Sequence, residues 1–350
     1  MPQRIAVIPG DGIGVEVTWA ARQVLDAVTR KHGVPFTYDE YDWSCQRYAA
    51  AGEMMPADAI ERLRPYDAIL LGAVGWPGVP DHVSLWGLLI PIRRAFRQYV
   101  NLRPIRVFEG VRSPLRDAGP EVDFVVIREN VEGEYSEIGG RLNRGFPDEF
   151  AVQESVFTRP GVTRIARFAF ELAATRRSHV TSATKSNGIV HTLPFWDEVV
   201  AEVAGEFPGV RTQSEHIDAL AAKVVLDPGR FDVIVASNLF GDILSDLAAA
   251  VAGSIGIAPS ANLDPTRTHP SMFEPVHGSA PDIAGQGIAN PVGAVWSAAL
   301  MLEHLGHPAA AADVMAAVEA TLAAPETRTR DLGGTADTAA VVSSLVAHLG

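Results

Sequence analysis

Short, fully apolar segments constrain the fold of this chain most strongly. They occupy residues 5–8, 68–71, 124–127 and 233–236, and each ends at a glycine or at polar residues. Such segments are typical of strands that are buried on both faces of a sheet. Between them lie stretches with the spacing of amphipathic helices, over residues 14–31, 164–175, 194–206, 309–323 and 335–348. This alternation predicts an α/β fold with parallel strands.

The size and charge of the chain limit its possible functions. Its 350 residues are enough for two domains of ordinary size. Its net charge of −13 argues against nucleic acid and anionic membranes as partners, because both attract clustered lysine and arginine. The single cysteine, Cys45, excludes an intrachain disulfide and is interpreted as an apolar filler. No apolar stretch is long enough to cross a membrane, so we expect a soluble, cytoplasmic protein.

The segment 136–157 differs from the rest of the chain. It is rich in glycine, arginine, asparagine, proline and aspartate, and it then alternates between apolar and polar residues over 150–157. This pattern predicts a β-hairpin that projects from the body of the protein as an arm.

Two aspartates and a lysine suggest a metal site with a base beside it. Asp242 and Asp246 are four residues apart, so on a helix they lie on one face. Adjacent carboxylates repel each other unless a cation lies between them, and their oxygens suit Mg²⁺ or Mn²⁺. Lys185 lies in a polar turn, where it is either a surface lysine or a base near the metal. On its own, Asp218 is weak evidence for a metal site.

Three arginines are candidates for binding a carboxylate, which a guanidinium group matches with two hydrogen bonds. Arg93 follows the start of an apolar helix, Arg103 precedes a proline, and Arg128 directly follows an expected strand. Arg94 and Arg97 are interpreted as surface residues, which is the default for arginine.

The loop around Gly278 is the better of two candidates for a nucleotide site. Gly278 lets the backbone approach a phosphate closely, and His277 and Ser279 can donate hydrogen bonds to phosphate oxygens. Asp282 can accept hydrogen bonds from both ribose hydroxyls and would repel a 2′-phosphate, which favours NAD over NADP. On its own, the loop is equally consistent with a plain connection. The turn 10–14 lacks the third glycine of the Rossmann fingerprint, so we expect it only to border a cleft.

Taken together and in this order, these segments resemble the β-decarboxylating dehydrogenases, the family of isocitrate, isopropylmalate and homoisocitrate dehydrogenases. The resemblance extends from residue 10 to the segment 331–335, nearly the whole chain. Within the family, the segments 81–87, 99–104 and 180–188 are most similar to the branch that oxidises tartrate and D-malate.

The resemblance implies an isopropylmalate-dehydrogenase-like α/β fold of two domains with a mixed sheet, which is not a classical Rossmann fold. Residues 1–100 and 255–350 would form a large cofactor-side domain. Residues 101–254 would form a small domain with the metal site, and its arm 136–157 would contact a second subunit. The expected assembly is a homodimer or larger, with Lys185 and Asp218 entering the site of the other subunit.

The resemblance also implies NAD- and metal-dependent oxidation, with decarboxylation, of a small (2R)-2-hydroxy dicarboxylic acid. Lys185 would take the hydroxyl proton, and Tyr135 would protonate the enolate left by CO₂. Mg²⁺ or Mn²⁺ would be held by Asp218, Asp242 and Asp246. The NAD-binding residues would be His277, Gly278, Ser279, Ala280, Asp282 and Asn290.

The group at C3 of the substrate distinguishes the members of this family, and Trp86 and Leu89 are the candidates for contacting it. Trp86 is bulky and has one hydrogen-bond donor, so we expect a small group, hydrogen in D-malate or hydroxyl in tartrate. The alternatives are isopropylmalate dehydrogenase and a catalytically silent regulatory relative. The sequence leaves open the preferred substrate, Mn²⁺ or Mg²⁺, a monovalent cation such as K⁺, and dimer or tetramer.

Overall fold

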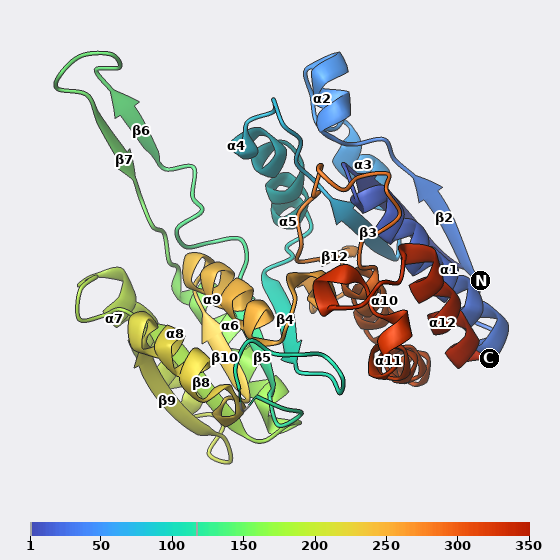
Figure 1. Cartoon of the computed structure of the whole chain (residues 1–350). Helices are drawn as coiled ribbons and strands as arrows, with labels where there is room; N and C mark the ends of the chain where they lie inside the picture. Colours follow the sequence, from blue (N-terminus) through green and yellow to red (C-terminus); the bar gives the residue numbers. More distant parts are fainter. Residues whose placement is uncertain (1, 117) are drawn as a thin grey trace.

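One large mixed sheet organises the computed structural model, which describes residues 2–116 and 118–350 (Figure 1). Its ten strands run in the order β2-β1-β3-β12-β11-β4-β5-β10-β8-β9. In that order they are Phe36–Glu40, Gln3–Gly10, Ala68–Ala73, Ser271–Pro275, Pro259–Leu263, Val100–Arg106, Asp123–Glu129, Val233–Ala236, His179–Thr184 and Arg211–His216. The predicted α/β fold with a mixed sheet is confirmed.

Two strands depart from the parallel pattern that the apolar segments predict. β4 and β11 are antiparallel to each other and to their outer neighbours, β5 and β12. Neither strand reads as an apolar run, because β4 contains Asn101 and Arg103, and β11 contains Ser260 and Asn262. These side chains are buried and form hydrogen bonds with one another or with groups of the candidate site.

Helices pack along both halves of the sheet. In the half that holds β1, β3, β11 and β12, the main group is α1 (Gly14–His32), α10 (Val292–His304), α11 (Pro308–Ala323) and α12 (Thr338–Leu349). In the other half, α6 (Arg159–Ala174) packs against α7 (Thr192–Ala204), and α8 (Ile217–Leu226) packs against α9 (Asn238–Val251). The five predicted helices are α1, α6, α7, α11 and α12. Both chain ends lie in the first half (Figure 1).

Shorter helices complete the first half and the connections. They are α2 (Cys45–Ala51), α3 (Ala59–Leu63), α4 (Asp81–Ser84), the π-helical turn η1 (Leu85–Leu89) and α5 (Ile90–Ala95). Single 3₁₀ turns cover Pro228–Arg230, Ile255–Ile257, Pro325–Thr327 and Arg330–Leu332. No helix in the described part of the chain has both the length and the apolar character needed to cross a lipid bilayer.

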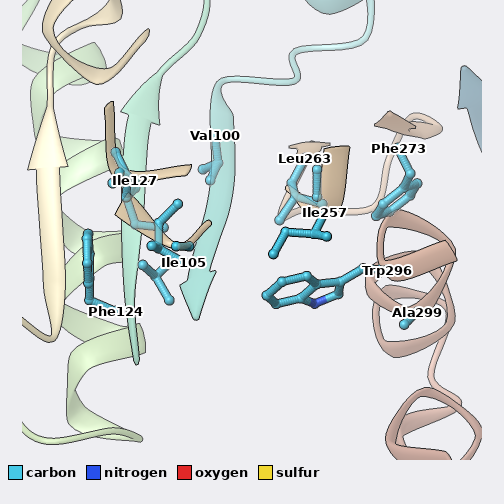
Figure 2. Close-up of a cluster of buried hydrophobic side chains, with 14 of the residues drawn as sticks. Val100, Ile105, Phe124, Ile127, Ile257, Leu263, Phe273, Trp296 and Ala299 are labelled. Atoms are coloured by element: carbon cyan, nitrogen blue, oxygen red, sulfur yellow. The ribbon is translucent and has the colours of Figure 1, made fainter. Parts of the chain in front are cut away.

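The core explains why the strands are apolar on both faces. In β1, Ile5 and Val7 join the cluster that packs against α1, whereas Ala6 and Ile8 join a second cluster with Trp43. The main cluster is continuous across the centre of the sheet, where side chains of β4 and β5 lie beside those of β11, β12 and α10 (Figure 2). The two halves of the sheet therefore share one apolar core.

The segment predicted as an arm forms a separate two-stranded antiparallel sheet, β6 (Gly139–Leu142) and β7 (Phe150–Gln153). It projects away from the rest of the chain (Figure 1), and every residue of both strands is exposed. The Gln153 amide donates a hydrogen bond of 2.8 Å to the carbonyl oxygen of Ser136, which ties the two sides of the hairpin together at its base.

A close approach between β3 and α1 supplies a test of this packing. A Cβ atom on Gly72 would lie 2.3 Å from the carbonyl oxygen of Pro9 and 2.7 Å from that of Gly14. Gly72→Ala is therefore expected to lower the free energy of unfolding by about 1–3 kcal/mol. Gly140→Ala in β6 meets no atom within 4 Å and should change it by less than about 0.5 kcal/mol. Urea denaturation compares the two variants, and equal stabilities would contradict this packing.

Candidate active site

A cluster of charged side chains lies where β5 ends and α9 begins. The Arg128 guanidinium is buried, only 2% exposed, and forms an ion pair with Asp242. Its Nε and Nη2 atoms donate to the Oδ1 atom of Asn238 at 3.0 and 2.7 Å. The Tyr135 hydroxyl donates to the other oxygen of Asp242 at 2.9 Å, and the guanidinium lies 5.5 Å from the centre of its ring. The structure thus joins a predicted acid, a predicted metal ligand and a predicted substrate arginine.

Arg103 connects the two aspartates of α9. Its Nη1 atom lies 3.2 Å from Oδ1 of Asp246 and donates to the Ser245 hydroxyl at 2.6 Å. Its Nη2 atom lies 3.4 Å from Oδ1 of Asp242. Asp242 and Asp246 lie about one helical turn apart on α9, and Arg103, which extends from β4, contacts both carboxylates. Two carboxylates on one helix face are a donor pair that suits a hard divalent cation.

The electrostatics of the cluster favour a protonated tyrosine. Burial raises the pKa of Tyr135, and the negative charge of Asp242 raises it further, while Arg128 opposes the shift. Burial also pushes the pKa of Asp242 upward, but the charges of Arg128 and Arg103 outweigh it and hold that pKa below its usual value. For Asp246, burial prevails over Arg103 and raises the pKa. Tyr135 therefore keeps its hydroxyl proton and donates it in a hydrogen bond to the ionised Asp242 carboxylate.

The segment between Arg128 and Tyr135 forms hydrogen bonds with the start of α9. Glu134 accepts hydrogen bonds from the Ser237 hydroxyl at 2.8 Å and from the Leu239 amide at 3.0 Å. A carboxylate at a helix N-terminus satisfies an amide that lacks a partner within the helix, and it complements the helix dipole. These contacts place Tyr135 over the first turns of α9.

Arg93 is buried nearby, with only 6% of the residue exposed. Its Nη2 atom donates to Oε1 of Glu274 in β12 at 2.7 Å, and the Asn262 amide donates to the same oxygen at 2.7 Å. The positive charge of Arg93 contributes to lowering the pKa of Asp242. All three predicted substrate arginines thus act on the same cluster, although Arg93 is paired with a carboxylate on the other half of the sheet.

Lys185 and Asp218 contact each other, but among the described residues they form no bond with this cluster. The Lys185 amine donates to Oδ1 of Asp218 at 2.7 Å, and the lysine lowers the pKa of that carboxyl. In the described part of the chain, no hydrogen bond or ion pair connects this pair to Asp242 or Asp246. Within residues 2–116 and 118–350, no three acidic, histidine or cysteine side chains gather to hold a metal ion. One chain therefore does not assemble the predicted three-aspartate site.

The helix expected to contact the substrate contains the π-helical turn η1, a feature often found at functional sites. Trp86 and Leu89 are both half-buried in this turn, and Leu89 packs against the second apolar cluster. Arg94, which we interpreted as a surface residue, is instead two-thirds buried and contacts Trp86 and Tyr135. Sequence spacing gave no sign of these contacts, because they depend on how α5 meets the base of the hairpin.

A cavity of about 1400 Å³ lies beside the predicted nucleotide loop. His277 and Asn290 line it, whereas Gly278, Ser279, Ala280 and Asp282 lie in the loop next to it. Other lining residues include Ile13, Ser254, Gly256, Ile288 and Asp331. The turn 10–14 borders this cavity through Ile13, whose amide donates to the Ser279 carbonyl at 2.8 Å.

The chemistry of the cavity fits an adenosine group. The His277 Nδ1 atom lies 2.9 Å from the Gly278 carbonyl oxygen, so Nδ1 carries the proton. Burial lowers the pKa of His277, which keeps the ring neutral and makes the unpartnered Nε2 atom an acceptor. This suits an amino donor better than the phosphate oxygen expected from the sequence. The exposed Asp282 carboxylate has no ion pair or hydrogen-bond partner in the described part of the chain.

Several residues of the site were not assigned a role from the sequence. Asp331 accepts hydrogen bonds from Asn290 at 2.9 Å and from Ser254 at 2.6 Å, and so shapes the cavity. Asn238 anchors Arg128, and Glu274 anchors Arg93. Asp331 lies in the segment 331–335, Asn238 lies four residues before Asp242, and Glu274 lies three residues before His277. The sequence therefore indicated their neighbourhood but not their partners.

The chain is similar to known proteins over nearly its whole length. The family model for isocitrate/isopropylmalate dehydrogenases matches residues 4–346. A probable tartrate dehydrogenase/decarboxylase of Bacillus subtilis is 55% identical over 347 residues, covering 99% of this chain and 97% of that protein. The D-malate dehydrogenase (decarboxylating) of Escherichia coli is 53% identical over 351 residues, covering 98% of this chain and 97% of that protein.

The fold agrees with these sequence relationships. The crystal structure of isocitrate dehydrogenase from Methylococcus capsulatus superposes with a TM-score of 0.90 at 34% identity, covering 99% of each chain. The resemblance inferred from the motifs is confirmed over nearly the whole length. This chain belongs to the isocitrate/isopropylmalate dehydrogenase family and is an enzyme of its β-decarboxylating group.

Proposed function

We propose that this enzyme uses NAD and Mg²⁺ or Mn²⁺ to oxidise and decarboxylate D-malate, tartrate or both. The observation that carries this proposal is the cluster in which Tyr135, Arg103 and Arg128 converge on Asp242 and Asp246. It combines a proton donor, cations for a carboxylate and a carboxylate pair for a metal. The names of the relatives at 53–55% identity support D-malate and tartrate as substrates.

The residues present suit a divalent metal shared between two chains. Asp242 and Asp246 would hold it from one subunit and Asp218 from the other, which is consistent with the absence of a three-ligand cluster among the described residues of one chain. When bound, the ion would supply Lewis-acid polarisation of the substrate. We also propose that residues 1–100 and 255–350 form one domain and residues 101–254 the other.

A homodimer is the proposed assembly. Leu142 and Phe150 on the hairpin are about half exposed, and Phe146 at its tip is 66% exposed. Leu226 on α8 is 82% exposed and Ile243 on α9 is 60% exposed. Apolar surface of this kind is unfavourable in water and is typical of a protein interface.

The chain's own residues account for the proton and carboxylate chemistry. Lys185 would take the C2 hydroxyl proton while a hydride passes from C2 to the nicotinamide. Arg93, Arg103 and Arg128 would hold the departing carboxylate until the bond to C3 breaks and CO₂ leaves. Tyr135, protonated because its pKa is raised, would give its proton to C3. The products are a keto acid, CO₂ and NADH.

The substrate and cofactor are tested together. With NAD and Mn²⁺, we expect NADH formation from D-malate or a tartrate isomer at a kcat/KM well above that for isopropylmalate or isocitrate. NADP should be a poor cofactor, because Asp282 would repel its 2′-phosphate. Asp246→Asn removes one charge from the carboxylate pair, so it should raise the Mn²⁺ concentration needed for half-maximal activity. Full activity after exhaustive dialysis against EDTA, or a preference for isopropylmalate, would contradict the proposal.

The separate roles of Lys185 and Tyr135 predict different transients in rapid mixing with the active hydroxy acid. Tyr135→Phe should keep a fast burst of NADH followed by slow turnover, because only the later proton transfer is impaired. Lys185→Met should lose the burst. General acid–base groups contribute ~10²–10⁴-fold, so the difference should be easily resolved. Lys223→Met on α8, which breaks an ion pair with Glu215 of β9, is the control and should behave as wild type. The opposite pattern would show that the two roles are wrongly assigned.

A further inference from the structure

Arg94 forms contacts with parts of the chain that are distant in sequence. Its Nη2 atom donates to the carbonyl oxygen of Tyr135 at 2.9 Å, and its Nη1 atom donates to the Glu137 carboxylate at 2.6 Å. Its guanidinium carbon lies 5.0 Å from the centre of the Trp86 ring. The side chain is 32% exposed, so water only partly weakens these contacts.

The hydrogen bond from Arg94 holds the main chain of Tyr135 in place. Its hydroxyl is held by Asp242 on α9, whereas its carbonyl oxygen is held by Arg94 on α5, in the other half of the molecule. The following residue is also fixed, because the Ser136 hydroxyl donates to the carbonyl oxygen of Glu154 at 2.6 Å. A tyrosine held at both ends has little freedom to change its distance from a substrate.

The same guanidinium holds the Trp86 ring. A cation over an aromatic face is attracted to it, and the planar guanidinium can stack there while its two outer nitrogens donate to other groups. Trp86 is in η1, on the turn that precedes α5, so Arg94 joins this turn to the base of the hairpin. The ring proposed to contact C3 of the substrate and the tyrosine proposed to protonate C3 therefore share one anchor.

We propose that Arg94 is a positioning residue that fixes Tyr135 relative to Trp86, and so controls both the protonation of C3 and the size of the group accepted there. This inference rests on the proposed function. Arg94 would not touch the substrate, and it would act only through these two side chains. Lysine could not replace it fully, because a single amine cannot bind two acceptors in a fork and also stack.

Arg94→Met tests this inference, with Arg106→Met as a matched control. Arg106 is 37% exposed, forms an ion pair of 2.5 Å with Glu319 and lies 5.3 Å from the centre of the Phe108 ring, in a different part of the sheet. Both variants lose an ion pair and an aromatic contact, so both should lower the midpoint of thermal unfolding slightly. Only Arg94→Met should affect the reaction.

Arg94→Met should retain the NADH burst with D-malate or tartrate but slow the steady state roughly ten- to a hundredfold, since a small misplacement of a reacting group costs that much. The ratio of kcat/KM for isopropylmalate to that for the preferred substrate should rise roughly tenfold, because the Trp86 ring is no longer held. Arg94→Lys should fall between Arg94→Met and wild type in both measurements.

Two results would overturn the inference. One is an Arg94→Met enzyme that matches Arg106→Met in burst, steady state and substrate ratio. The other is an equal loss of burst and steady state with an unchanged substrate ratio, which would indicate general damage to the site. A wild-type enzyme that forms no NADH from any of these acids would instead refute the proposed function, and the inference with it.

Discussion

The structure of the site depends on the buried charge of Arg128. A guanidinium that is 2% exposed has lost almost all its water, so it is tolerable only with a carboxylate and acceptors around it. Asp242 and Asn238 supply both from the first turns of α9. Removing one member of such a buried pair typically costs about 3–5 kcal/mol. The position of α9 against β5 is therefore fixed by the same residues that are proposed to bind substrate and metal.

Because a buried charge needs a partner, each arginine of the site is paired with a carboxylate. Arg103 and Arg128 compensate Asp242 and Asp246 within one chain, and Arg93 is compensated by Glu274. A dicarboxylate substrate and a divalent cation add opposite charges of similar size, so both can enter together without leaving an unpaired buried charge. Either one alone would disturb the pairs, so we expect the proposed metal and substrate to bind in concert.

The sequence predicted the parts of this structure that are local. Apolar runs located β1, β3, β5 and β10, because strands buried on both faces must be apolar. The strands β4 and β11 did not meet this criterion, because buried polar residues interrupt their apolar ones: Asn101 of β4 pairs across the sheet with Ser260 and Asn262 of β11. Motifs located Asp242 and Tyr135, but their hydrogen bond depends on how distant segments meet. The contacts of Arg94 could not be predicted for the same reason.

We propose that each active site takes groups from two subunits. This proposal can be tested by mixing the Lys185→Met and Asp246→Asn variants, after dissociation and reassociation, at a Mn²⁺ concentration too low for Asp246→Asn alone to turn over. In a mixed dimer, one site would receive the intact Lys185 and the intact Asp246, and the other would carry both defects. Random pairing of equal amounts makes about half the dimers mixed, and one of the two sites in each mixed dimer is intact. Shared sites should therefore recover about a quarter of wild-type activity. Activity no greater than the sum of the separate variants would contradict it.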